Sequence, residues 1–153
     1  MKGKIVIRRA AAGERADLEA LQRRASLNNP GDRDAILAHP DAIELPPEQI
    51  ASGAVRVAEQ DGVRRGVSVV LRRDDGDAEL DGLFVDPVVW RSGIGRALVE
   101  HAAHQARELG ASVLHVVGNP HAEGFYAAVG FTTHGTFETR FGTGLLMRKI
   151  LND

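Results

Sequence analysis

The spacing of apolar residues changes along the chain from helical to extended and back, and it predicts the secondary structure. Apolar residues at helical spacing, such as Leu18, Leu21 and Ala25, mark one buried face of a predicted helix. The helices predicted in this way span residues 13–26, 32–39, 47–52, 93–109 and 121–129. Extended apolar runs predict strands over residues 4–8, 54–59, 67–72, 79–85, 112–117, 131–137 and 144–150.

The order of these elements predicts a mixed α/β fold, with helices on the faces of one sheet. Asp61-Gly62 marks a turn between the strands at 54–59 and 67–72, in a connection longer than a two-residue hairpin. A second turn at 74–77 leads to the strand at 79–85, so a β-meander is expected. No repeat or linker interrupts the pattern. We therefore expect one domain over residues 1–153.

Composition narrows the classes of function. The absence of cysteine among 153 residues excludes a disulfide framework, a thiolate metal site and a cysteine nucleophile, and we expect no metal site. A net charge of −2 argues against broad electrostatic binding of nucleic acid. No apolar run reaches the roughly 18 residues of a membrane span, and no signal-peptide core is evident at the N-terminus. We expect a cytoplasmic protein without a membrane or nucleic-acid partner.

The segment from Trp90 to Arg96 has the features of a phosphate-binding loop. It joins a strand to a helix that opens on Gly93-Ile94-Gly95, where free backbone N–H groups and the positive end of the helix dipole attract anions. Arg91 and Arg96 can add charge-assisted contacts. The segment lacks the Gly-Lys-Ser/Thr of a Walker loop and the third small residue of a dinucleotide fingerprint. A plain strand–helix turn with glycines for packing is the alternative.

A second motif runs from Asn119 to Phe131, and the two motifs together resemble the GNAT (Gcn5-related) N-acetyltransferases. That family has Gln/Arg-x-x-Gly-x-Gly/Ala opening a helix, and then Asn-x-x-Ala-x-x-Phe-Tyr-x-x-x-Gly-Phe. The residues that match the second pattern in register are Asn119, Ala122, Phe125, Tyr126, Gly130 and Phe131. The resemblance implies a central, mostly antiparallel sheet flanked by helices.

One position departs from the family's pattern. Trp90 stands where the family has Gln or Arg, and Arg91 stands where a glycine often follows. Because the family uses this loop mainly through backbone amides, we expect phosphate binding to persist, with Arg91 or Arg96 supplying the side-chain contacts.

The resemblance implies that the cofactor is acetyl-CoA (coenzyme A). Backbone groups of the strand at 83–85 would pair with the pantetheine amides, in a gap where this strand splays from the next, and Gly82 could permit a bulge there. The residues expected to bind the cofactor are Leu83, Phe84, Val85, Arg91, Ser92, Gly93, Ile94, Gly95, Arg96, Asn119, Phe125 and Tyr126. Asn119 would also cap the short helix that follows it.

Three residues are candidates for catalysis. The resemblance implies that Tyr126, the only tyrosine, is the general acid for the leaving thiolate; packing against its aromatic neighbours is the alternative. Glu79 and Asp81 are candidates for the base that deprotonates the attacking amine, and a bulge would place them on different faces. They could instead be solvated carboxylates. A backbone N–H near Leu83 or Phe84 could stabilise the oxyanion.

The leading hypothesis is an acetyl-CoA-dependent N-acetyltransferase that acts on a primary amine of a small molecule or peptide by direct attack in a ternary complex. The alternative is a non-catalytic acyl-CoA-binding or sensing module on the same fold. A third possibility is a toxin that acetylates aminoacylated tRNA. The acidic bias of residues 28–47 suggests a cationic acceptor. The family often dimerises through late strands, so we also expect a homodimer.

Overall fold

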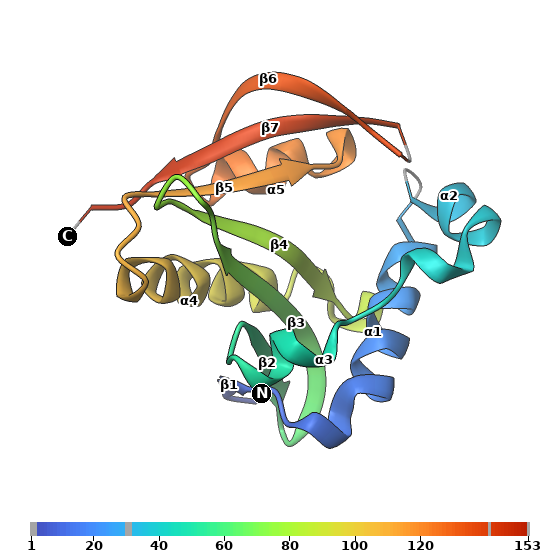
Figure 1. Ribbon diagram of the computed structural model, residues 1–153. Coiled ribbons are helices and arrows are strands. Elements are labelled where there is room, and N and C mark those ends of the chain that lie inside the picture. The colour runs from blue at the N-terminus through green and yellow to red at the C-terminus, as the bar shows by residue number, and fades with distance from the viewer. Residues whose placement is uncertain (1–2, 30–31, 141, 153) are drawn as a thin grey trace.

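One sheet organises the computed structural model, which describes residues 3–29, 32–140 and 142–152. Across these residues seven strands lie in the order β1-β2-β3-β4-β5-β7-β6 (Figure 1). The strands are β1 (Ile5–Arg9), β2 (Val55–Gln60), β3 (Val63–Arg72), β4 (Ala78–Val85), β5 (Val113–Gly118), β6 (Thr132–Thr139) and β7 (Gly142–Ile150). Neighbours are antiparallel except β4 and β5, which run parallel. The expected mixed α/β fold with a mostly antiparallel sheet is confirmed.

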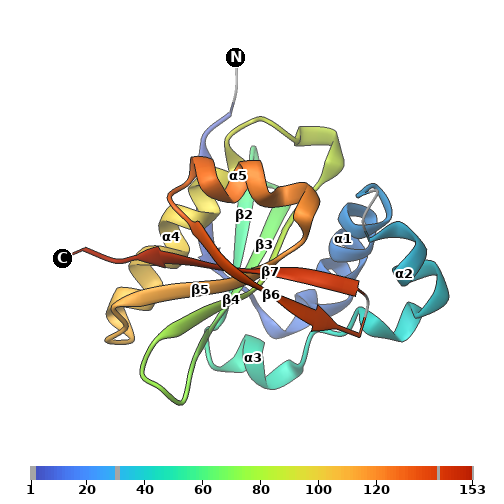
Figure 2. The same cartoon turned by 90° about the horizontal axis from the view of Figure 1, so that it is seen from above.

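Helices cover both faces of this sheet (Figure 2). They are α1 (Arg15–Leu27), α2 (Arg33–Ala38), α3 (Pro47–Ala51), α4 (Ile94–Glu108) and α5 (Glu123–Ala128), with single 3₁₀ turns η1 (Ala12–Glu14), η2 (Pro40–Ala42), η3 (Pro87–Val89) and η4 (Pro120–Ala122). Leu18 of α1 packs in a cluster with Val57 of β2, whereas Leu98 of α4 packs with Ala58, the next residue of that strand. Because successive strand residues face opposite sides, α1 and α4 lie on opposite faces. None of the described helices is long and apolar enough to cross a membrane.

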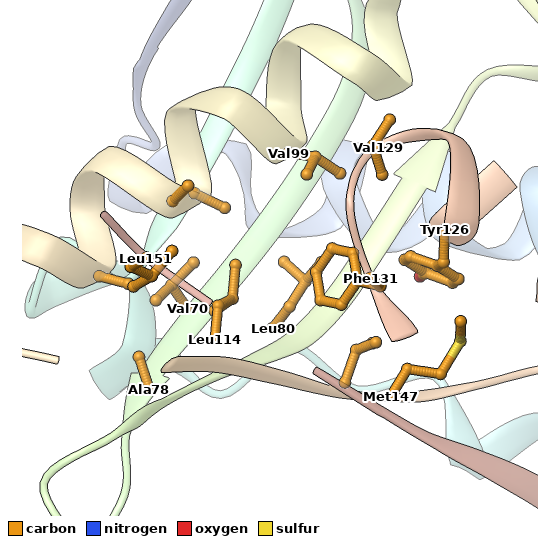
Figure 3. Close-up of a cluster of buried hydrophobic side chains, with 14 of the residues drawn as sticks. Val70, Ala78, Leu80, Val99, Leu114, Tyr126, Val129, Phe131, Met147 and Leu151 are labelled. Atoms are coloured by element: carbon orange, nitrogen blue, oxygen red, sulfur yellow. The ribbon is translucent and has the colours of Figure 1, made fainter. Parts of the chain in front are cut away.

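The largest hydrophobic cluster links α4 and α5 to the strands beneath them (Figure 3). Leu114 and Met147 contribute from β5 and β7, and Tyr126 lies at the edge of the cluster beside Phe131. The second sequence motif is therefore tied directly to the core.

The connection between β2 and β3 corrects one prediction. A longer link and a strand over 67–72 were expected, but Asp61 and Gly62 alone form the turn, with φ of 54° and 77°. Positive φ at both central residues gives the tight turn that suits a hairpin. The polar start of β3 resembled a loop because its arginines look solvated. In the structure Arg64 instead pairs with the buried Glu14, at 2.5 Å.

The strands β4 and β5 separate soon after they meet. They pair only through Ala78 with Leu114 and Glu79 with His115. A contact of 2.9 Å between His115 Nε2 and Asp77 Oδ2 joins the strands at this closed end. Beyond it the strands diverge (Figure 1), which confirms the expected splay.

A β-bulge interrupts β4 next to the splay. Val69 of β3 is opposite Gly82, but Val70 is opposite Leu80, so Asp81 is the additional residue. The bulge lies beside Gly82 as expected. It changes the direction of the side chains that precede it relative to those that follow.

Candidate functional site

A cleft of about 890 Å³ opens where β4 and β5 diverge, walled by α1, α2, α5 and the loop before α4. Most of the residues predicted from the motifs line it: Asp81, Leu83, Phe84, Val85, Arg91, Gly93, Gly95, Arg96, Asn119, Phe125 and Tyr126. Glu79, Ser92 and Ile94 are not among the lining residues. The motifs gave no indication of Gln22 or Ser26, which line the cleft because α1 folds against it, and no role was predicted for His121, which lines the cleft from the turn η4.

Backbone groups of β4 are available on the side that faces the gap. Asp86 N–H donates to Arg65 O on β3 at 2.8 Å. Because strand backbones alternate, Phe84 also turns its N–H and C=O toward β3, whereas Leu83 and Val85 turn theirs away. No neighbouring strand pairs with Leu83 or Val85 on that side among the described residues. This edge can therefore bind an extended ligand that carries amide groups.

Trp90 makes an internal contact that the motif did not predict. Its indole Nε1 donates to Val85 O at 2.7 Å, and the ring, 45% exposed, lines the cleft. The following residue, Arg91, takes a positive φ of 66°. Trp90 thus anchors the loop to the end of β4, and the arginines on either side of the glycines remain for an anion.

The N-terminus of α4 has the geometry of an anion site. Gly93 caps the helix with φ of 91°, and the first helical bond runs from Ala97 N–H to Gly93 O. The N–H groups of residues 94–96 therefore have no acceptor within the helix. Arg91 and Arg96 are exposed, and neither has a hydrogen-bond or ion-pair partner among the described residues. Two cations and several N–H groups converge on one opening.

Two residues of this loop serve the structure through their side chains. Ile94 is 1% exposed in the cluster beneath α4, and Ser92 Oγ donates to Val89 O at 2.5 Å. Any contact that these two residues make with an anion would therefore come from their backbone groups.

Small residues let the aromatic side chains of α5 approach the cleft. A Cβ on Gly95 would meet the Phe125 ring at 3.1 Å, and a Cβ on Gly118 would meet the Tyr126 ring at 3.3 Å. The glycine that opens α4 and the one that ends β5 thus both accommodate the second motif.

Tyr126 combines a buried ring with an unused hydroxyl. The residue is 8% exposed, and its ring makes edge-to-face contacts with Phe125 and Phe131, at centroid distances of 5.3 and 5.4 Å. No described residue forms a hydrogen bond with its hydroxyl. Burial, reinforced by the negative charge of Asp32, raises the pKa of Tyr126 to about 12. The hydroxyl is therefore a proton donor at neutral pH.

Asn119 is held by both ends of its amide. Its Oδ1 accepts from His121 N–H at 2.9 Å, which confirms the expected capping of the following turn. Its Nδ2 donates to Asp32 Oδ1 at 2.8 Å. The second bond joins positions 87 residues apart, and no local sequence signal could indicate it.

The two candidate bases lie in different surroundings. Asp81, on the bulge, lines the cleft; its side chain remains accessible, yet partial burial of the carboxyl group there raises its pKa. Glu79 is paired within the sheet, opposite Leu71 and His115, and outside the lining of the cleft. Of the two carboxylates, only that of Asp81 lines the cleft.

Comparison with known proteins agrees with this geometry. The model of the acetyltransferase (GNAT) family matches residues 18–131. A peptidyl-lysine N-acetyltransferase of Escherichia coli, YjaB, is 48% identical over 59 residues, which cover 39% of each chain. An uncharacterized N-acetyltransferase of Mycobacterium tuberculosis is 33% identical over 92 residues, covering 58% of this chain and 59% of that protein. The matches thus span less than two thirds of these relatives.

Solved structures show the same fold over nearly the whole chain. A GCN5-related N-acetyltransferase from Rhodopseudomonas palustris superimposes with a TM-score of 0.78 at 20% identity, covering 99% of this chain and 98% of that one. The PaiA N-acetyltransferase of Thermoplasma acidophilum, in complex with coenzyme A, gives 0.77 at 18% identity, covering 96% and 99%. Because the family model also matches more than half of the sequence, the chain belongs to the GNAT acetyltransferase family.

Proposed function

We propose that this protein forms one domain that transfers an acetyl group from acetyl-CoA to a primary amine of a small molecule or peptide, by direct attack. The observation that carries the proposal is that one cleft is lined by an anion site, a strand edge that no other described strand pairs with, and a tyrosine whose ring is buried and whose hydroxyl has no hydrogen-bond partner among the described residues. Coenzyme A needs this combination, because it presents a pyrophosphate, two amides and a thiol in sequence. Coenzyme A bound to relatives of the same fold supports the assignment.

The residues present fit the cofactor at each of these points. Arg91, Arg96 and the N–H groups of residues 94–96 would hold the pyrophosphate. A Cβ on Gly93 would stand in open space, with nothing within 4 Å, so the glycine leaves room for a phosphate to approach the backbone. Leu83 and the N–H group of Val85 would bind the pantetheine amides from this edge of β4, since Val85 O already accepts from Trp90.

The chemical step assigns one task to each residue around the reacting atoms. When bound, acetyl-CoA supplies a thioester whose carbonyl carbon the amine attacks; a C–N bond forms and the C–S bond breaks. An alkyl ammonium with a pKa of about 10.4 must first lose a proton, and Asp81 accepts it, directly or through water. Leu83 N–H donates to the developing oxyanion. Tyr126 would give its proton to the departing sulfur, and the second proton that the nitrogen loses would restore the tyrosine through water.

Titration calorimetry with acetyl-CoA, followed by detection of free thiol with a panel of amines, tests the proposal. We expect binding in the micromolar range or tighter and release of coenzyme A that depends on the amine. Absence of binding at high micromolar acetyl-CoA would overturn the assignment.

A pair of substitutions on β4 separates the candidate bases. We expect Asp81→Asn to lower kcat/KM roughly 100-fold, because it removes the proton acceptor within the cleft. Glu79→Gln, two positions away and outside the cleft lining, is the matched control and should change the rate less than about threefold. The pH profile supplies a second readout: since burial raises the pKa of Asp81, the wild-type rate should fall with decreasing pH earlier than for an ordinary aspartate. A larger loss in Glu79→Gln would reassign the base.

Trp90 is the only tryptophan, so it reports on the loop directly. We expect acetyl-CoA to change the intensity or emission maximum of its fluorescence, because the half-exposed ring lines the cleft and bonds to the strand edge that the pantetheine would occupy. A titration that saturates at the calorimetric affinity would support this placement. A constant spectrum under saturating cofactor would contradict it.

A further inference from the structure

The cleft contains two carboxylates that come from separate parts of the fold. Asp81 lies on the bulge of β4, and Asp32 lies at the start of α2. Both line the cleft, and neither forms an ion pair with any described residue. In the proposed acetyl transfer Asp81 is the base that deprotonates the attacking ammonium. Asp32 therefore has a charge that the proposed chemistry does not use.

Asp32 is fixed in place. Its Oδ1 accepts from Asn119 Nδ2 at 2.8 Å, and the other end of the Asn119 amide is held by the backbone of His121. This leaves Oδ2 without a partner among the described residues. The side chain makes no capping bond to α2, although the residue has the capping position. Oδ2 of this carboxylate is thus available to a ligand in the cleft.

The surroundings of Asp32 indicate that it contacts the acceptor amine. Its charge acts on Tyr126, which lines the same cleft and whose hydroxyl has no hydrogen-bond partner among the described residues. Asp32 also borders a second cavity of about 440 Å³, which shares Val117, Asn119 and His121 with the cleft. A ligand that reaches the reacting centre can therefore extend past Asp32 into this cavity.

We propose that Asp32 is a specificity-determining residue that binds a second cationic group of the acceptor, so that preferred acceptors carry two positive charges. The inference rests on the proposed acetyl transfer. A fixed, half-buried carboxylate gains a charge-assisted hydrogen bond from such a group. An acceptor without a second charge would cover the carboxylate without supplying a donor to Oδ2, and a site built to bind a polar group of its substrate discriminates against an analogue that lacks the group. The second charge can belong to a diamine or to a basic residue beside an acetylated lysine.

Substitution of Asp32 by asparagine isolates the charge. Asp32→Asn keeps an oxygen that can accept from Asn119, so the position of Asn119 is preserved while the negative charge is lost. Asp34→Asn, on the exposed side of α2 and outside the cleft, is the matched control. The probes are diaminobutane against butylamine, and a lysine peptide with a flanking lysine against the same peptide with a flanking serine.

We expect wild type and Asp34→Asn to prefer the doubly charged probe of at least one pair. Asp32→Asn should reduce that preference in kcat/KM roughly 10-fold, the scale of a charge-assisted hydrogen bond. Its affinity for acetyl-CoA should not change. If the preference is lost for the amine pair, the second charge belongs to a diamine. If it is lost for the peptide pair, the second charge belongs to a residue beside the acetylated lysine. An unchanged preference in Asp32→Asn would overturn the inference and leave the proposed function standing.

Calorimetry of the same probes against the protein saturated with coenzyme A tests the role of Asp32 separately from the proposed acetyl transfer. Weaker binding of the doubly charged probe to Asp32→Asn supports Asp32 even where turnover is absent. Bound amine without acetylation would overturn the proposed function alone. Equal binding to both proteins would overturn the assignment of Asp32 alone.

Discussion

Replacement of Tyr126 by phenylalanine should lower kcat roughly 100- to 1,000-fold, the range in which a positioned general acid contributes. The hydroxyl is well suited to this task, since its pKa of about 12 keeps it protonated while it has no internal partner to give up. The ring contacts with Phe125 and Phe131 do not involve the hydroxyl, so they persist in the variant. Steady-state kinetics with an accepted amine measure the loss.

Two controls accompany this variant. Its affinity for acetyl-CoA and its thermal midpoint should both match wild type, because only one solvated or unpaired oxygen is removed. If kcat falls less than about threefold, Tyr126 is a packing residue and another group protonates the thiolate. If wild type itself binds acetyl-CoA but acetylates no amine, the fold acts as a sensor of the cofactor.

Local sequence patterns were enough to define the parts of the site that are contiguous in the chain. The stripe on α4 predicted a helix over 93–109, and the structure has it from Ile94 to Glu108. Gly110 follows with φ of 86°, as its position after the stripe indicated. Here the glycine, the apolar period and the tertiary contacts all favour the same boundary, so propensity and packing agree.

Local sequence patterns could not decide between Glu79 and Asp81 as the candidate base. A regular strand would direct both side chains to one face, whereas a bulge directs them apart. The position of the bulge depends on how β4 aligns with Val69 and Val70 of β3, which is a property of the pairing and not of β4 alone. Gly82 indicated that a bulge was permitted, but only the register shows that Asp81 is the additional residue.

Contacts between residues far apart in the chain also could not be predicted from local sequence patterns. The bond from Trp90 to Val85 O accounts for an aromatic residue where the family has a polar one. Asp32 was one of several acids whose combined charge suggested a cationic acceptor, and its bond to Asn119 is what gives it a fixed position. In both cases the residue type permits several partners, and only the folded chain selects one.

The second large effect is expected at the N-terminus of α4, where Gly93→Ala should weaken acetyl-CoA binding roughly 10- to 100-fold, equivalent to the loss of one or two charge-assisted hydrogen bonds. At φ of 91° an alanine is strained, and its Cβ would occupy the open space through which a phosphate reaches the N–H groups. Relief of that strain would also turn these groups away from the anion. Calorimetric titration of acetyl-CoA measures the loss.

The other end of the same helix provides a control with nearly identical strain. Gly110 has φ of 86° and, like Gly93, nothing within 4 Å of an added Cβ. Both alanine variants should therefore lose about 1–2 kcal/mol of unfolding free energy, measured by denaturant titration. Only Gly93→Ala should lose affinity for acetyl-CoA, because Gly110 follows the C-terminus of α4 and does not line the cleft. Equal affinities in the two variants would mean that the pyrophosphate does not bind at Gly93. A loss in both would mean that strain anywhere in α4 distorts the site.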